Sequence, residues 1–185
     1  LGAKVDAYAA AVEELTRLKK EYEQALAQVQ PKLQAAPNPS PFNKLSAQQS
    51  ELASGQQQME SAAQGEEFEQ ALQQANDLGT KVDAYTAAVE ELTRLKTEYE
   101  QALAQLQPKL QSAPNPSPFN KLAPQQAELA SGQQLMESAA TSEDFEQALQ
   151  QANDLGTKVD AYTTAVDELK KSKESYEQAL AQLEP

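Results

Sequence analysis

The chain of 185 residues is acidic, with a net charge of −13, and it contains no Cys, His or Trp. Without Cys and His, the common nucleophilic triads, thiolate zinc sites and His-containing di-iron sites are excluded. Acidic residues spread along the sequence also disfavour binding to nucleic acid and adsorption to anionic membranes. No run of 18 apolar residues and no signal-peptide pattern is present, so we expect no membrane insertion.

A repeat of 77 residues organises the whole sequence. Residues 1–77 and 78–154 are identical at 65 of 77 positions, and a partial third copy covers 155–185. Because 77 residues are eleven heptads, an apolar heptad pattern keeps its register from one copy to the next. We therefore divide the chain into two repeat units and a partial third, and expect it to be an excerpt from a longer array.

The first helix predicted in each unit runs from about Leu78 to Gln107 in the second copy and carries most of a long apolar seam. Proline lacks an amide donor and clashes with the preceding turn, so Pro108 is expected to kink or end this helix. Leu110 continues the apolar spacing beyond it, which leaves a frayed extra turn as an alternative.

A proline-rich connection follows, from Pro37 to Phe42 and from Pro114 to Phe119. Prolines at alternate positions forbid a helix and force an extended chain. A polyproline helix repeats every three residues, so prolines spaced by two do not line one face. We interpret the segment as a stiff connection whose Phe plugs the end of a helix bundle; a ligand site is the alternative.

The second helix is predicted at roughly Ser46 to Ala63 and Pro124 to Ala140. Ser46 with Gln49 fits a capping box, and Pro124 suits the first turn of a helix. The apolar stripe of this helix is thin, with these members in the first copy: Leu45, Gln48, Leu52, Gly55, Met59 and Ala62.

The third helix is predicted to begin at Phe68 and Phe145, after turns at Gln64-Gly65 and Thr141-Ser142. The acidic residues that follow these turns suit a helix N-terminus. Apolar residues then recur at steps of three or four, with Lys96 filling one step, which is the pattern of a heptad seam in helices packed lengthwise. The members of this seam are Phe68, Ala71, Ala75, Leu78, Val82, Tyr85, Val89, Leu92, Tyr99, Leu103 and Leu106.

At Leu78-Gly79, and again at Leu155-Gly156, this helix either runs on into the next unit or turns. A turn would place Gly79 at a left-handed helix end, with Thr80 and Asp83 capping a restart. Ala3 replaces Thr80 in the first copy, and a break has no reason to keep the seam in phase. We therefore expect one continuous helix shared by consecutive units.

Polar groups on the seam have structural explanations. Its tyrosines are expected to bury their rings and place their hydroxyls at the rim of a bundle; they are Tyr8, Tyr22, Tyr85, Tyr99, Tyr162 and Tyr176. A seam lysine can lay its stem on the core and reach water, or can fix the helix register; such lysines are Lys19, Lys96 and Lys173.

Pairs of adjacent carboxylates do not indicate catalysis, because neighbouring helical side chains diverge by about 100°. Exposed ion pairs to a base four residues later explain them better: Glu13 with Arg17, Glu90 with Arg94, and Asp167 with Lys171. The sequence predicts no catalytic, cofactor-binding or metal-binding residue, and no cofactor.

These elements predict an all-α chain of tandem three-helix bundles, at approximately residues 1–83 and 84–160, that share long helices. The connectivity resembles that of spectrin-like repeats. The resemblance is architectural, since the tryptophan of the first spectrin helix is missing here, and it implies no partner for any residue. Close tandem copies are also similar to the repeat-built stalks of large bacterial surface or secreted proteins.

We expect a non-enzymatic spacer or stalk within a larger protein at the cell surface or outside the cell, whose helices pack on neighbouring repeats of the same chain. The alternative is a multivalent protein-binding module that uses one exposed helix face per unit. A contiguous exposed apolar patch would favour the alternative. The first residues to inspect for it are Leu18, Leu95 and Leu135.

Overall fold

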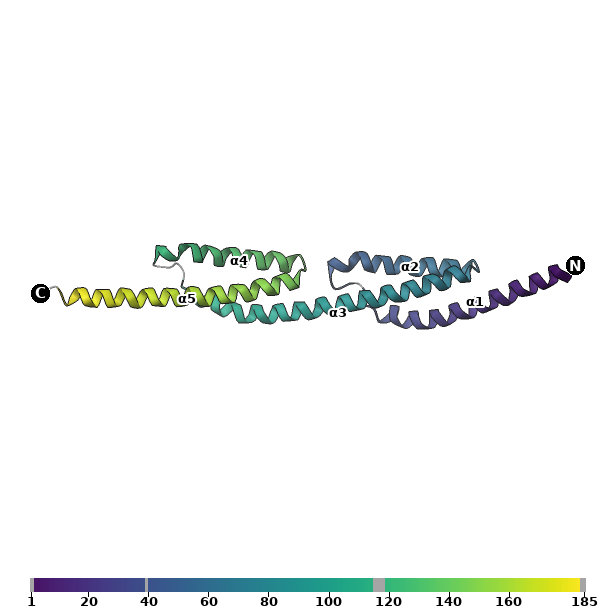
Figure 1. Cartoon of the computed structure of the whole chain (residues 1–185), viewed down its shortest axis with the longest axis horizontal. Helices are drawn as coiled ribbons and strands as arrows, with labels where there is room; N and C mark the ends of the chain where they lie inside the picture. The colour runs from purple at the N-terminus through teal and green to yellow at the C-terminus, as the bar shows by residue number, and fades with distance from the viewer. Residues whose placement is uncertain (1, 39, 115–118, 184–185) are drawn as a thin grey trace. The chain divides into compact units, whose positions relative to one another are not determined.

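The computed structural model describes residues 2–38, 40–114 and 119–183, and their regular structure is entirely helical. The all-α prediction is confirmed. The elements in chain order are α1 (Gly2–Ala35), the 3₁₀ helix η1 (Asn43–Leu45), α2 (Ser46–Gln64), α3 (Phe68–Ser112), the 3₁₀ helix η2 (Asn120–Leu122), α4 (Ala123–Thr141) and α5 (Phe145–Ala181). The α-helices are labelled in Figure 1.

Contacts divide the chain into two units, Leu1–Leu92 and Thr93–Pro185. In the first unit α1 and α2 contact the first half of α3. In the second unit α4 and the end of α3 contact α5, with α4 lying beside the first half of α5 (Figure 1). The division falls inside α3, whereas the sequence period restarts at Leu78, so α3 contributes to both units.

The long helix is continuous at both positions where a turn was considered. α3 runs through Leu78-Gly79, and α5 runs through Leu155-Gly156. The Thr80 hydroxyl donates to the Asn76 carbonyl at 3.2 Å, one turn earlier, which places it inside a helix. The predicted continuous helix is confirmed, and a restart cap at Thr80 is wrong.

The seam is the core of both units. Every apolar seam residue between Phe68 and Leu106 is buried or half-buried, and Ala71 and Ala75 are completely buried. Lys96 is exposed and lies 3.8 Å from Glu100 on the next turn. The helix therefore packs along one apolar side, as the heptad spacing indicates.

Pro108, which was expected to kink or end a helix, lies inside one, and so does Pro31, its counterpart in the first copy. α1 continues through Pro31 to Ala35, and α3 continues through Pro108 to Ser112. The extra turn makes tertiary contacts to the next long helix: Lys32 Nζ lies 2.6 Å from Asp83 Oδ2, and Lys109 makes the same contact to Asp160. Half-buried leucines in these turns add apolar contact, which offsets the lost backbone bond.

The capping box predicted for the second helix is wrong. α2 follows directly on η1, so Leu45 is the N-cap and Ser46 already has helical backbone angles, φ −60° and ψ −35°. Gln49 instead accepts a bond from the Ser40 amide at 2.9 Å and donates to the side chain of Asn38. Pro124 does lie in the first turn of α4, as predicted.

The apolar stripe of α2 differs from the prediction at one position. Gln48 is exposed, whereas Leu45, Leu52, Met59 and Ala62 are buried. Leu45 and Leu52 are one heptad apart and both buried, so the phase of the stripe is kept and only the polar member faces solvent.

The turns into α3 and α5 each place a glutamate in the left-handed backbone conformation, where a glycine is usual. Glu66 has φ 59° and Glu143 has φ 57°, whereas Gly65 at the predicted turn has φ −79°. The Glu67 amide donates to the Ala62 carbonyl at 2.9 Å, which closes a Schellman-type helix end. In the second unit Asp144 also caps α5 by accepting from the Gln147 amide at 3.4 Å.

Because the left-handed region costs an L-residue about 1–2 kcal/mol, Glu66→Gly is expected to stabilise the first unit by about 1 kcal/mol, part of the gain being lost to the entropy of the unfolded chain. Urea unfolding followed by circular dichroism measures the change. Gly65→Ser, which copies Ser142, is the control and should change stability by less than about 0.5 kcal/mol. Equal effects of the two substitutions would contradict the conclusion that Glu66, and not Gly65, has the left-handed backbone conformation.

Two related glycines differ in how closely a neighbouring helix approaches. A methyl group at Gly79 would lie 3.2 Å from Val29 Cγ2, whereas at Gly156 it would lie 3.9 Å from Leu106 Cδ1. Valine is stiff at χ1 and cannot move aside without shifting its helix. Gly79 therefore permits a closer helix contact in the first unit than Gly156 does in the second.

Alanine in place of a helical glycine gains up to about 1 kcal/mol. We expect Gly156→Ala to gain most of this, and Gly79→Ala to be at least about 1 kcal/mol less favourable because of the contact with Val29. Urea unfolding of the two variants tests the difference. Adding Val29→Leu to Gly79→Ala should recover part of the loss; equal gains from the two single variants would be incompatible with the packing described.

Candidate interaction surfaces

Within the described ranges, no group of three or more Cys, His, Asp or Glu side chains could hold a metal ion. None of the helices in the same ranges is long and apolar enough to cross a membrane. The remaining features with chemical character are ion pairs, seam tyrosines, uncovered apolar residues and small pockets.

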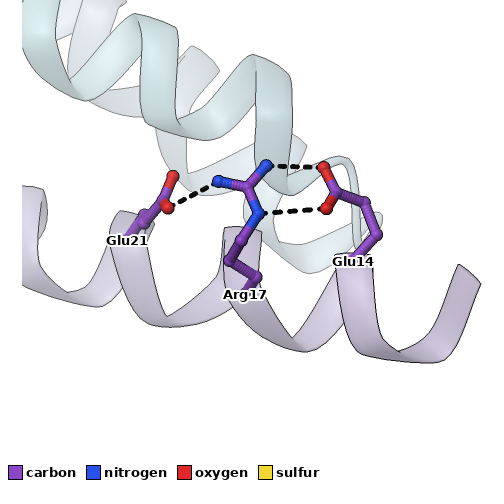
Figure 2. Close-up of polar contacts among 3 residues, drawn as sticks. All are labelled: Glu14, Arg17 and Glu21. Carbon is purple, nitrogen blue, oxygen red and sulfur yellow. Dashed lines mark hydrogen bonds and ion pairs between the residues drawn. The ribbon is translucent and has the colours of Figure 1, made fainter. Parts of the chain in front are cut away.

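Arg17 forms the centre of an exposed ion-pair cluster on α1 (Figure 2). Its Nε donates to Glu14 at 3.0 Å and its Nη1 donates to Glu21 at 2.6 Å. These hydrogen bonds lower the pKa of Glu14 and raise the pKa of Arg17. The predicted pairing with Glu13 is wrong, because Glu14 offers two oxygens to the guanidinium one turn earlier.

The other predicted ion pairs change in a similar way. Arg94 pairs with Glu98, four residues later, and Asp167 pairs with Lys170 at 4.0 Å rather than with Lys171. These side chains are about half exposed, which is typical of pairs that add little stability. They form a solvated helix face.

Two seam tyrosines fix the proline-rich connections. The Tyr85 hydroxyl donates to the Pro37 carbonyl at 2.8 Å, and Tyr162 makes the same bond to Pro114 at 3.0 Å. Both rings are among the most buried side chains of the protein. The predicted arrangement, a buried ring with its hydroxyl at the rim, is confirmed for this pair.

A second pair of tyrosines packs at the opposite end of each unit. The Tyr22 ring lies 6.2 Å from that of Phe68, and the Tyr99 ring lies 6.3 Å from that of Phe145, both tilted. Burial raises the pKa of each hydroxyl, and a nearby carboxylate, Glu60 for Tyr22, adds to the rise. These rings are core residues, as predicted.

The last two seam tyrosines are exposed, which corrects the prediction. Tyr8 belongs to a row of exposed residues on α1, called here the α1 apolar stripe: Val5, Tyr8, Val12 and Leu15. On α5, Tyr176 is exposed together with Leu180. The residues 77 positions away, Tyr85 and Tyr99, are covered by neighbouring helices. At Tyr8 and Tyr176 the helix extends beyond such neighbours, so its seam side faces solvent.

Each unit has a small pocket beside its buried tyrosine. The pockets have volumes of about 270 and 230 Å³ and include no charged side chain. Eight residues of the first pocket have a counterpart of the same type, 77 positions later, in the second pocket. In the first unit they are Leu33, Ala36, Pro37, Gln49, Leu52, Ala53, Gln56 and Tyr85.

The proline-rich connection is described only in part. Phe42 is buried and Phe119 half-buried, which agrees with their predicted place at the end of the packed helices. Pro39 and residues 115–118 lie outside the described residues. The choice between a stiff connection and a ligand site therefore stays a prediction.

The leucines singled out as a possible binding patch do not share one environment. Leu18 and Leu95 are half-buried, whereas Leu135 on α4 is 54% exposed. The first copy has Gln58 at the position of Leu135. An exposed leucine present in one unit only does not provide a repeated binding face.

The bond between Tyr85 and Pro37 can be tested by making the same substitution at two equivalent seam positions, one buried and one exposed. Tyr85→Phe leaves a partly buried carbonyl without its donor and is expected to cost about 1–2 kcal/mol. Tyr8→Phe changes an exposed residue at the same seam position and should cost less than about 0.5 kcal/mol. Urea unfolding compares them, and a Tyr85→Phe variant as stable as the parent would refute a structural role for the hydroxyl.

No family model, no curated protein and no solved structure matches the chain. The interpretation of its surfaces therefore rests on their own geometry and chemistry.

Proposed function

We propose that this chain is a segment of a non-enzymatic array of tandem three-helix units, resembling spectrin-like repeats, that serves as an elongated spacer or stalk within a larger protein. The observation that carries the proposal is the unbroken helix α3, Phe68–Ser112, whose first part packs in one unit and whose last part packs in the other. A helix used in this way couples consecutive units mechanically.

The length of α3 supports a spacer. Its 45 residues span about 68 Å at 1.5 Å per residue. A compact globule of 185 residues has a radius of gyration of about 16 Å, which corresponds to a diameter of about 40 Å. A helix longer than that diameter favours an extended chain over a compact one.

The non-enzymatic part of the proposal rests on the chemistry of the sequence. The usual bases and nucleophiles His and Cys are missing, and the carboxylates pair with Arg or Lys on solvated helix faces. A catalytic acid or base usually needs a partly buried site, whereas the side chains of these pairs are about half exposed. A place at the cell surface or outside the cell belongs to the same proposal.

A multivalent protein-binding module is the second candidate, and the repeated pockets beside Tyr85 and Tyr162 favour it. Identical lining in consecutive units would give a partner evenly spaced sites. The spacer is preferred because each tyrosine already has a structural bond to its proline carbonyl.

Small-angle X-ray scattering tests the spacer. We expect a radius of gyration of about 25 Å, the value for a rod of 80–100 Å built from the helical rise, and not the value of about 16 Å for a compact chain. Thr93→Pro, at the division between the units, removes a backbone bond from α3 and should broaden the distance distribution. A radius near the compact value for the parent chain would rule out the spacer.

A further inference from the structure

We propose that the α1 apolar stripe is a docking site for another unit of the same 77-residue repeat, joined ahead of Leu1, which would supply the end of its first helix, its proline connection and its second helix. The inference rests on the proposed function, because it names the partner that the array requires at this face. It assigns a role to exposed residues that the spacer proposal leaves without one.

The first argument is that the same residues are core elsewhere in this chain. Val5 and Tyr8 are 63% and 74% exposed, whereas Val82 and Tyr85, one period later, are each 1% exposed. The sequence from Lys4 to Tyr8 is identical in both copies. The sequence of the helix therefore cannot explain the difference in exposure. The helices that pack against the second copy explain it.

The second argument comes from the residues that cover the buried copy. Val29 of α1 packs against Gly79, and Gly55 of α2 packs against Leu78. The Pro37 carbonyl accepts the bond from Tyr85. A partner for the α1 stripe therefore needs an aliphatic first-helix end, a close-packing helix with a glycine, and a carbonyl acceptor for Tyr8.

The third argument is charge complementarity beside the stripe. In the buried copy Asp83 lies 2.6 Å from Lys32, and Lys81 lies 3.9 Å from Glu51. The matching residues of α1 are Asp6 and Lys4, which are both exposed. A partner that offers one lysine and one glutamate at these two places satisfies both charges, and the repeat unit itself offers them.

Other occupants fit this combination less well. A second copy of the present chain has already engaged Lys32 and Pro37 with its own α3, so it would first have to displace that helix. An apolar surface alone would leave Asp6 and Lys4 without partners when they are desolvated, which is unfavourable. A unit with a vacant place for a third helix meets every requirement without displacement.

Single cysteines give a direct test, since the chain has none. In the 185-residue chain, Val5→Cys should react rapidly with a thiol reagent and Val82→Cys slowly, because a buried thiol is protected. When a further copy of residues 1–77 is fused ahead of Leu1, the labelling rate of Val5→Cys should fall to that of Val82→Cys. An unchanged rapid rate in the fused chain would overturn the docking.

Two controls establish what covers the stripe. Fusion to an unrelated helical domain of similar size should leave Val5→Cys reactive, and protection by that domain would overturn a specific site. Replacing the added copy's counterpart of Leu52 by Asp should restore reactivity, while Asp at the counterpart of exposed Ser54 should not. If Val5→Cys in the unfused chain becomes protected as protein concentration rises, a second copy is the occupant and the joined unit is wrong.

The docking and the spacer fail separately. Scattering of the fused chain reports its length whether or not the stripe is covered. A long particle in which Val5→Cys still reacts rapidly overturns the docking and leaves the spacer in place. A protected thiol in a particle with the radius of a compact globule overturns the spacer and supports the docking.

Discussion

Burial of one apolar stripe along α3 is the interaction on which both units depend. A helix that carries such a stripe for its full length must be covered along its full length, because each uncovered large side chain forfeits about 1.5–3 kcal/mol. α1 and α2 cover the first part of the stripe, and α5 covers the last part. The close approach of α1 to α3 at Gly79 is one result of packing neighbouring helices against this stripe.

The proline-rich connections are specified from the same helix. A buried tyrosine needs an acceptor for its hydroxyl, and the carbonyl of Pro37 or Pro114 provides one at the point where the chain leaves the preceding helix. In the turn before that point, Lys32 pairs with Asp83, which lies two residues before Tyr85 on the long helix. One face of α3 or α5 thus fixes where the previous helix ends.

Sequence reasoning succeeded wherever periodicity decides the structure. The heptad spacing predicted the buried residues of α3, and the unbroken phase predicted that Leu78-Gly79 is helical. It failed where a tertiary neighbour decides. The helix continues after Pro108, where Lys109 contacts Asp160 and Leu110 is half-buried, and Tyr8 is exposed although Tyr85, at the same seam position, is buried.

Local turn chemistry was also missed, since the left-handed position falls on Glu66 beside a glycine that would suit it better. For the interaction surfaces, the sequence supplied the residue types but not their partners. Ion-pair rules give several partners for Arg17 at similar spacing, and rotamers select among them. The pockets beside the tyrosines could not be anticipated, because their walls come from three segments far apart in the chain.

Near-identity of the copies has a consequence for how such a chain reaches its native state. With 65 of 77 positions shared, a helix from one copy can pair with the wrong neighbour at almost no energetic disadvantage, a recognised hazard of tandem repeats. Gly79 faces Val29 and Gly156 faces Leu106, which is one of the few differences between the copies that can distinguish correct from exchanged pairing. Such core differences between the copies therefore favour correct pairing over exchanged pairing.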